Sequence, residues 1–185
     1  MAEAALCLVR PVLSALGSLI KKMTCNSVIA VVLPRHCGKS SFINSITAKD
    51  SLLLDIEENV QLEMSEAERT KLQTLSGNAS YNLHYFPICR DYLVKVKKNH
   101  KFKKIIVLCS DLELCKYLGI SAVFTFVPSN SLAKTLGEAF PEDQKARFEE
   151  SRLSLLLGTK KIYTFNGFDD LHKMIIQRFK LQQKL

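Results

Sequence analysis

Gly38, Lys39 and Ser40 stand in an order and spacing that could bind phosphate. They follow a continuous apolar run at 28–33 and precede apolar residues at helical spacing, which predicts a buried strand, a tight loop and the start of a helix. In the pattern G-x-x-x-x-G-K-[S/T], main-chain amides surround a phosphate group, the lysine reaches its oxygens and the hydroxyl holds Mg²⁺. We therefore expect a nucleotide-binding loop at this position.

One residue departs from that pattern, because Leu33 stands where the first glycine would be. That glycine normally lets the chain turn sharply out of the strand. The alternative interpretation is a plain strand-to-helix turn that carries a surface lysine. If the loop does bind phosphate, we expect the contacts to come from Pro34, Arg35, His36, Cys37, Gly38, Lys39, Ser40 and Ser41.

Residues 27–46 resemble the Walker A unit of P-loop nucleoside and nucleotide kinases. The order of predicted elements over 27–179 is similar to theirs. Short apolar strands alternate with helices, which by itself favours a parallel sheet. The resemblance implies a three-layer α/β domain over 27–185, with five parallel strands in the order 2-3-1-4-5 and helices on both faces. It also implies ATP or GTP with Mg²⁺ as cofactors. The Asn-Lys-x-Asp guanine motif is absent from the sequence, which argues against a GTPase.

The resemblance suggests roles for four more residues. Asp55 ends the second predicted strand, where such kinases place an acceptor-binding acid or a base; the alternative is a capping or solvated side chain. Asp111 follows the third predicted strand, as a Walker B acid would, and could order the Mg²⁺ shell together with Ser40; it could equally cap the next helix. Arg147 and Arg152 would be the arginines of a lid and would stabilise, together with Lys39 of the loop, the charge on the transferred phosphoryl group. Alternatively, the two arginines form surface ion pairs along their helix.

Two further segments could contact anionic partners. Residues 81–90 combine aromatic side chains with Arg90, which we expect to follow an apolar loop, where it would suit an acceptor phosphate. These aromatic side chains could instead belong to the core. The lysine run at 95–104 could contact RNA, or could be the solvated end of a basic helix.

Composition limits the class of protein more than its function. The chain has 185 residues and a formal charge of +8, which favours polyanionic partners. Six cysteines without a Cys-x-x-Cys pair indicate reduced thiols and a cytoplasmic location, with Cys37 in the loop as a plain residue or an oxidation-sensitive thiol. We expect residues 1–26 to form a helical extension that packs on the domain, contacts a membrane or partner, or targets the protein, but does not span a membrane.

Three functions are consistent with these features. The first is a small nucleoside or nucleotide kinase that uses ATP and Mg²⁺, with Asp55 or Arg90 meeting the acceptor. The second is a nucleotide- or RNA-binding P-loop protein with little or no turnover, which the replaced glycine and the lysine run favour. The third is a regulatory or scaffold domain that kept the fold and lost the nucleotide.

Overall fold

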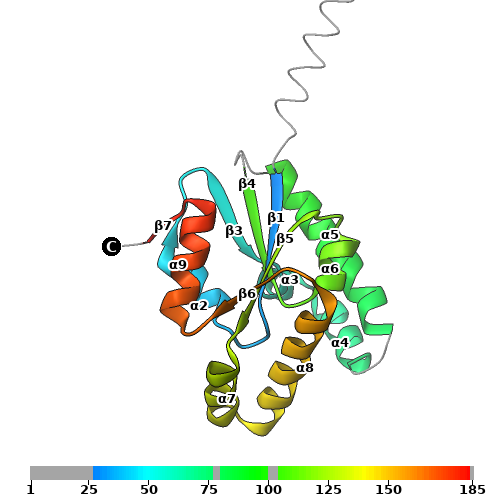
Figure 1. Ribbon diagram of the computed structural model, residues 1–185. Helices are drawn as coiled ribbons and strands as arrows, with labels where there is room; N and C mark the ends of the chain where they lie inside the picture. Colours follow the sequence, from blue (N-terminus) through cyan, green and yellow to red (C-terminus); the bar gives the residue numbers. More distant parts are fainter. Residues whose placement is uncertain (1–26, 77–79, 100–103, 184–185) are drawn as a thin grey trace, which may run out of the picture.

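The computed structural model describes residues 27–76, 80–99 and 104–183 of the chain (Figure 1). Its five-stranded sheet is parallel throughout and has the order β3-β4-β1-β5-β6. Counted along the chain, this is the predicted order 2-3-1-4-5. The strands are β1 (Ser27–Val32), β3 (Ser51–Asp55), β4 (Lys104–Cys109), β5 (Ala122–Pro128) and β6 (Ile162–Phe165).

Helices cover both faces of this sheet, which gives the three-layer α/β arrangement that was predicted. In Figure 1, α2 and α9 lie on one side of the sheet, α5 and α6 lie on the other, and α7 and α8 lie at the lower end. The helices are α2 (Lys39–Ser45), α3 (Ile56–Glu63), α4 (Glu66–Thr74), α5 (Ser80–Asn99), α6 (Leu112–Tyr117), α7 (Asn130–Ala139), α8 (Glu142–Gly158) and α9 (Phe168–Phe179).

Strand β1 supplies the core on both faces because its side chains alternate. Val31 and Leu33 pack into the cluster that contains Phe42 of α2 and Ile175 of α9. Val32 and its alternate neighbours pack into the other cluster, with residues of α3, α5 and α6. A short antiparallel ribbon, which the sequence did not predict, joins β2 (Ile46–Thr47) to β7 (Gln182–Gln183).

The prediction of an apolar loop before Arg90 is wrong. Residues 80–99 form the single helix α5. Five side chains are buried at helical spacing along it, and this burial keeps the segment helical even though Pro87 lies inside it. The basic helix expected from residue 91 is the second half of α5. The proposed extension at 1–26 and two lysines of the run, Lys101 and Lys103, lie outside the described residues.

The parallel sheet separates the two segments that could bind anions. The loop after β1 and the start of α2 lie at the carboxyl edge of the sheet. Helix α5 has Lys97 and Lys98 in its last turn and ends shortly before β4 begins, so this end of the helix lies at the amino edge, at the top of Figure 1. A contact of Lys97 and Lys98 with RNA would therefore be remote from the loop. Among the described helices, none has the length and apolar character that crossing a membrane requires.

Candidate phosphate-binding site

The loop between β1 and α2 has the alternating backbone that forms an anion-binding concavity. His36 has φ 62° and Gly38 has φ 70°, whereas neither Arg35 nor Cys37 has a positive φ. Such alternation directs successive N–H groups toward one point. The Phe42 N–H donates to Gly38 O at 2.9 Å, and Gly38 provides no side-chain cap. In the described structure, the N–H groups of Lys39, Ser40 and Ser41 have no protein acceptor and are available to an anion.

Leu33 does not obstruct this loop. Its side chain is fully buried in the same core cluster as Val31 and Phe42, and its N–H donates to Cys109 O at 3.0 Å, which extends the β1–β4 pairing by one residue. Its φ is not positive, so the backbone here does not need glycine. The chain makes its turn later, at His36 and Gly38, which explains how the loop forms without the first glycine.

Lys39 reaches across the carboxyl edge of the sheet to an acidic partner. Its Nζ lies 3.1 Å from Glu57 Oε2 and 2.8 Å from Ser110 Oγ. The Ser110 N–H donates to Glu57 Oε1 and the Ser110 hydroxyl donates to Glu57 Oε2, each at 2.7 Å. Burial alone would raise the pKa of Glu57, but the charge of Lys39 and the hydrogen bonds from Ser110 outweigh it and lower that pKa. Glu57 is therefore an ionised partner that holds Lys39 in place.

Ser40 lies beside two carboxylates. Its hydroxyl donates to Glu58 Oε2 at 2.5 Å and lies 3.4 Å from Asp55 Oδ2. Asp55 is buried at 3% exposure and caps α3 by accepting the Glu58 N–H. Burial raises the pKa of Asp55, although Lys39 and the Glu58 N–H partly oppose this. A cation beside Ser40 would favour the ionised form of Asp55, so these oxygens form a suitable hard-ligand set for Mg²⁺.

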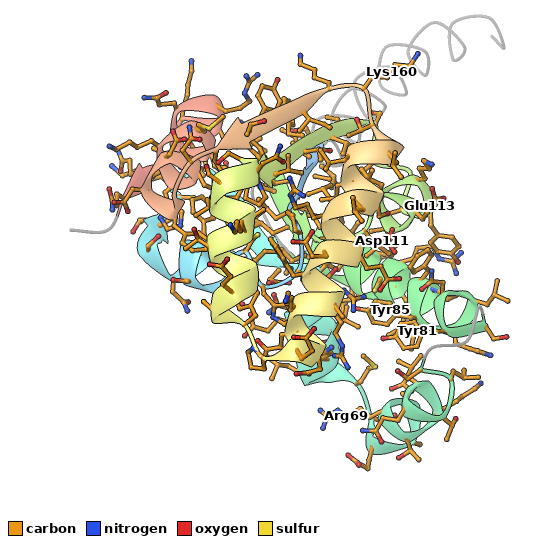
Figure 2. All side chains as sticks on the ribbon, turned by 60° about the horizontal axis from the view of Figure 1, so that its bottom comes forward. Arg69, Tyr81, Tyr85, Asp111, Glu113 and Lys160 are labelled. Atoms are coloured by element: carbon orange, nitrogen blue, oxygen red, sulfur yellow. The ribbon has the colours of Figure 1, made fainter. Side chains whose placement is uncertain are left out.

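Asp111, which the sequence placed either in the Mg²⁺ shell or at a helix cap, makes a capping contact. It is the N-cap of α6, and its Oδ1 accepts the Glu113 N–H at 2.7 Å (Figure 2). Of the two interpretations left open from the sequence, the structure supports the capping one. Within the described residues, His, Cys, Asp and Glu side chains form no group of three that could hold a metal ion.

The three predicted arginines lie in different surroundings. Arg147 is exposed on α8 near His36. Arg152 is turned toward α7, where its Nη2 donates to Asn130 Oδ1 at 2.5 Å and its Nη1 lies 3.7 Å from Glu149. Arg90 is exposed on α5, pairs with Asp91 and lies over the Tyr117 ring. Of the three, Arg147 is the one whose charge acts on a residue of the loop, His36.

Cys37 is not the exposed thiol that the sequence suggested as one possibility. It is 1% exposed and packs into the core cluster below the loop. Burial raises its pKa to about 12, although Lys39 opposes the shift. The Cys37 N–H donates to Pro34 O at 3.3 Å within the loop, and the Cys37 side chain anchors the loop to the core.

Glu57, Glu58 and Ser110 are site residues that the sequence interpretation missed. The signal was present in the run Asp55-Ile56-Glu57-Glu58, directly after the second strand. What could not be seen was that α3 begins at Ile56, which turns Glu57 toward β4 rather than continuing the strand. Ser110 gave no sequence signal, because only the parallel pairing of β3 with β4 brings it to Glu57.

Two tyrosines of α5 lie near this acidic group. The Tyr81 and Tyr85 ring centroids are 5.4 Å apart (Figure 2). Burial raises the pKa of Tyr81, with Arg35 opposing the shift and Glu57 adding to it, so both charges act on this phenol. The first turns of α5 therefore border the site on the side of Glu57.

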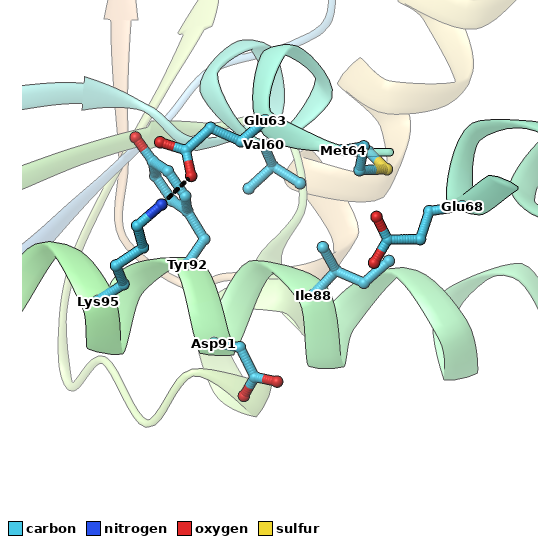
Figure 3. Close-up of a pocket in the computed structure, with 8 residues that line it drawn as sticks. All are labelled: Val60, Glu63, Met64, Glu68, Ile88, Asp91, Tyr92 and Lys95. Carbon is cyan, nitrogen blue, oxygen red and sulfur yellow. Dashed lines mark hydrogen bonds and ion pairs between the residues drawn. The ribbon is translucent and has the colours of Figure 1, made fainter. Parts of the chain in front are cut away.

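A separate cavity of about 250 Å³ lies between α3, α4 and α5 (Figure 3). No residue of the loop between β1 and α2 lines this cavity. Its lining is formed by Val60, Glu63, Met64, Glu68, Ile88, Asp91, Tyr92 and Lys95. Lys95 Nζ lies 2.6 Å from Glu63 Oε2, as the dashed line in Figure 3 marks. This lysine of the predicted RNA-contacting run is therefore already paired with a carboxylate.

Comparison of the sequence with protein-family models and with curated proteins finds no match. Similar solved structures include the tunicamycin resistance protein of Deinococcus radiodurans, at a TM-score of 0.55 and 20% identity over 86% of this chain and 99% of that one. Shikimate kinase from Aquifex aeolicus has a TM-score of 0.45, with 15% identity over 83% of this chain and 96% of that one. Thymidylate kinase from Candida albicans has a TM-score of 0.41, with 10% identity over 86% of this chain and 98% of that one.

The likeness to the tunicamycin resistance protein concerns the fold alone. The chain therefore shares its fold with that protein, and in this chain the candidate phosphate-binding loop lies between β1 and α2.

Proposed function

We propose that this protein binds a nucleoside triphosphate with Mg²⁺ at residues 34–41 and transfers its terminal phosphoryl group to a small acceptor. The observation that carries the proposal is the convergence of the loop amides, Lys39 and Ser40 on one edge of the sheet, opposite the acids Asp55 and Glu57. Phosphoryl transfer depends mainly on positioning and charge stabilisation, which such a group of residues supplies.

Each residue has a specific part in this proposal. The amides of Gly38 to Ser41 bind phosphate oxygens, and Lys39 exchanges Glu57 for a phosphate oxygen. Mg²⁺, held by Ser40 with Asp55, would neutralise charge on the phosphates. Asp111 keeps its capping role. Arg147 is the predicted lid cation that lies next to the loop, and Arg152 supports the α7–α8 pair through Asn130.

Glu57 is our candidate for the residue that accepts the proton of the acceptor hydroxyl. Once Lys39 turns to phosphate, Glu57 loses the charge that lowers its pKa most, and its affinity for a proton rises. Asp55, the base expected from the sequence, lies against Ser40 on the metal side. Arg90 has no described contact with the loop, so we assign the acceptor site to the start of α5 rather than to Arg90.

A second candidate function is nucleotide binding with little turnover. The observation that favours it is the connection between α7 and α8, which consists only of Phe140 and Pro141. A kinase lid is a segment that closes over the bound phosphates. With so short a connection, closure would require movement of α8 itself.

Thermal unfolding with and without nucleotide tests binding. At a hundred times Kd, MgATP or MgGTP stabilises the folded state by about 2.7 kcal/mol, which raises Tm by roughly 5 to 10 °C for a chain of this size. Lys39→Ala should abolish this rise. Lys116→Ala, which removes an exposed lysine of α6 paired with Glu113, should retain it. Nucleotide-independent Tm values in the wild type would refute the binding proposal.

Transfer of the terminal phosphoryl group then separates the kinase from the binding protein. Nucleosides, nucleotides and 5′-hydroxyl RNA are the acceptors to test with labelled ATP. We expect Glu57→Gln to retain nucleotide binding and to lower kcat by a factor of about 10² to 10⁴, the usual contribution of a general base. Binding without transfer to any of these acceptors would favour the second candidate function.

A further inference from the structure

Three basic side chains gather on the outer side of the loop, where α8 packs against it. Arg35 and His36 are exposed loop residues, and Arg147 is exposed on α8. The Arg35 N–H donates to Ser151 Oγ of α8 at 3.2 Å. The His36 ring centroid lies 5.6 Å from that of Phe140, at the junction of α7 and α8. The packing of α8 on the loop therefore places these side chains on one side of the loop, where the charges of Lys39, Arg147 and Arg35 act on His36.

This cluster carries more positive charge than its acidic neighbours balance. Among the ion pairs of the described residues, none involves Arg35 or Arg147, whereas Arg152 of the same helix pairs with Glu149. Lys39 adds a further cation on the α2 side, although it is paired with Glu57. An uncompensated group of cations beside an anion-binding loop is the arrangement expected of a site for a multiply charged anion.

His36 is the titratable member of the cluster. Partial burial lowers its pKa, and the charges of Lys39, Arg147 and Arg35 lower it further, while Asp143 of α8 opposes them. The imidazole is therefore neutral at pH 7 in the free protein. It also holds a φ of 62°, a region that few residues other than glycine occupy. Strained backbone at a ligand-binding loop is a common sign of a functional constraint.

We propose that His36 is a proton-coupled phosphate-binding residue, which takes up one proton from solvent when the terminal phosphate of a nucleotide enters between the loop and α8. The imidazolium then joins Arg35 and Arg147 as a donor to that phosphate. This inference rests on the proposed nucleotide binding, but not on catalysis. It adds to the pH dependence that the exchange of Lys39 from Glu57 to phosphate would produce, and this Glu57 contribution is common to the wild type and to variants of His36.

The sign of the effect follows from the charges. A bound phosphate brings negative charge toward His36 and raises its affinity for a proton, so its pKa is higher in the complex than in the free protein. The extra binding free energy is fully present below the pKa of the free protein. It is lost as the pH rises through the pKa of the complex. A pKa difference of about one unit would strengthen binding by up to about tenfold at low pH.

Two substitutions separate charge from geometry at this position. His36→Asn removes the proton site but retains a residue that tolerates the left-handed backbone region. His36→Lys carries a permanent positive charge. Isothermal titration calorimetry with Mg²⁺ and a non-hydrolysable ATP analogue, in buffers of different ionisation enthalpy at pH 7, gives the number of protons taken up. The nucleotide's own titration is the same for all three proteins and cancels in the comparison.

We expect the wild type to take up a larger fraction of a proton than either variant. Between pH 6 and pH 8, Kd should rise in the wild type by several-fold relative to His36→Asn, and His36→Lys should bind at pH 8 more tightly than His36→Asn. NMR titration of the His36 imidazole gives a direct check, because the chain has four histidines and His36→Asn identifies the signal. Its pKa should rise when the analogue binds.

The failure of this inference is distinguishable from failure of the proposed function. If the wild type binds the analogue, but His36→Asn shows the same proton uptake and pH dependence, or the pKa of His36 does not rise, the role of His36 is refuted and nucleotide binding stands. If the analogue binds neither the wild type nor Lys39→Ala, the nucleotide site is refuted, and the role of His36 with it.

Discussion

The Nζ atom of Lys39 lies 3.1 Å from Oε2 of Glu57, so the loop lysine is paired with a carboxylate. The lysine side chain is 10% exposed and the glutamate side chain 25% exposed. This partial burial makes the pair stronger than an exposed surface pair. A polyphosphate that binds the loop must therefore compete with Glu57 for Lys39, and this competition couples binding to the protonation of Glu57.

Glu57→Gln should lower the free energy of unfolding at pH 7 by roughly 1 to 3 kcal/mol, because it removes a charge-assisted contact. The folded-state pKa of Glu57 is lowered from 4.5, so its stabilising effect is present above about pH 4.5 and is lost as the pH falls through the lower folded-state value. Wild type and variant should therefore converge in acid. Burial raises the pKa of Asp55, which therefore titrates in the opposite sense, and the charge of Glu57 adds to that shift.

Urea unfolding at pH 7, 5 and 3.5 measures this difference. A stability difference that stays constant over that range would show that the charge of Glu57 does not contribute to the pair.

Leu33→Gly restores the glycine of the usual pattern, yet it should damage the protein. Its fully buried side chain packs into the core, and its backbone does not need glycine, so we expect a loss of about 3 to 5 kcal/mol in unfolding free energy. Nucleotide affinity should not improve. Leu33→Val, which keeps most of the buried volume, allows the affinity to be measured if Leu33→Gly does not fold. A tenfold gain in affinity for Leu33→Gly would mean that Leu33 obstructs the phosphate position.

Gly38→Ala and Gly119→Ala form a matched pair. Both glycines have a positive φ, 70° and 67°, and no atom approaches the position of an added Cβ closer than 3.7 Å. Each substitution should therefore cost about 1 to 2 kcal/mol of stability through backbone strain alone. Only Gly38→Ala should also weaken nucleotide binding, because only Gly38 sets the direction of the loop amides. Chemical unfolding and nucleotide titration of both variants check this; equal losses of affinity would contradict it.

Cys37 should react slowly with iodoacetamide in the folded protein at pH 8. The thiolate is the reactive form, and burial raises the pKa of Cys37 to about 12. Peptide mass spectrometry after labelling should find Cys37 largely unmodified in native buffer and fully modified in urea. Native labelling at the rate of a free thiol would show that the loop opens readily.

The sequence determined the fold of this protein because its strongest signals are local. The apolar run before Gly38 requires a strand buried on both faces, and further apolar runs alternating with amphipathic segments require a parallel sheet. Gly38, Lys39 and Ser40 fixed the position of the candidate site by spacing alone. The apolar residues of 80–99 recur at helical spacing, and their burial makes this segment a helix. The sequence interpretation did not recognise this spacing, because aromatic residues and Pro87 interrupt the segment.

The tertiary structure alone decided which side chains face one another across the carboxyl edge of the sheet. Ser110 is 53 residues from Glu57, and strand pairing brings them within hydrogen-bonding distance. For the same reason Asp55, rather than Asp111, lies at Ser40, since α3 starts at the end of β3 and Asp111 turns to cap α6. The surroundings of His36 likewise exist only because α8 packs on the loop, since electrostatic contacts depend on distance in space and not on separation along the chain.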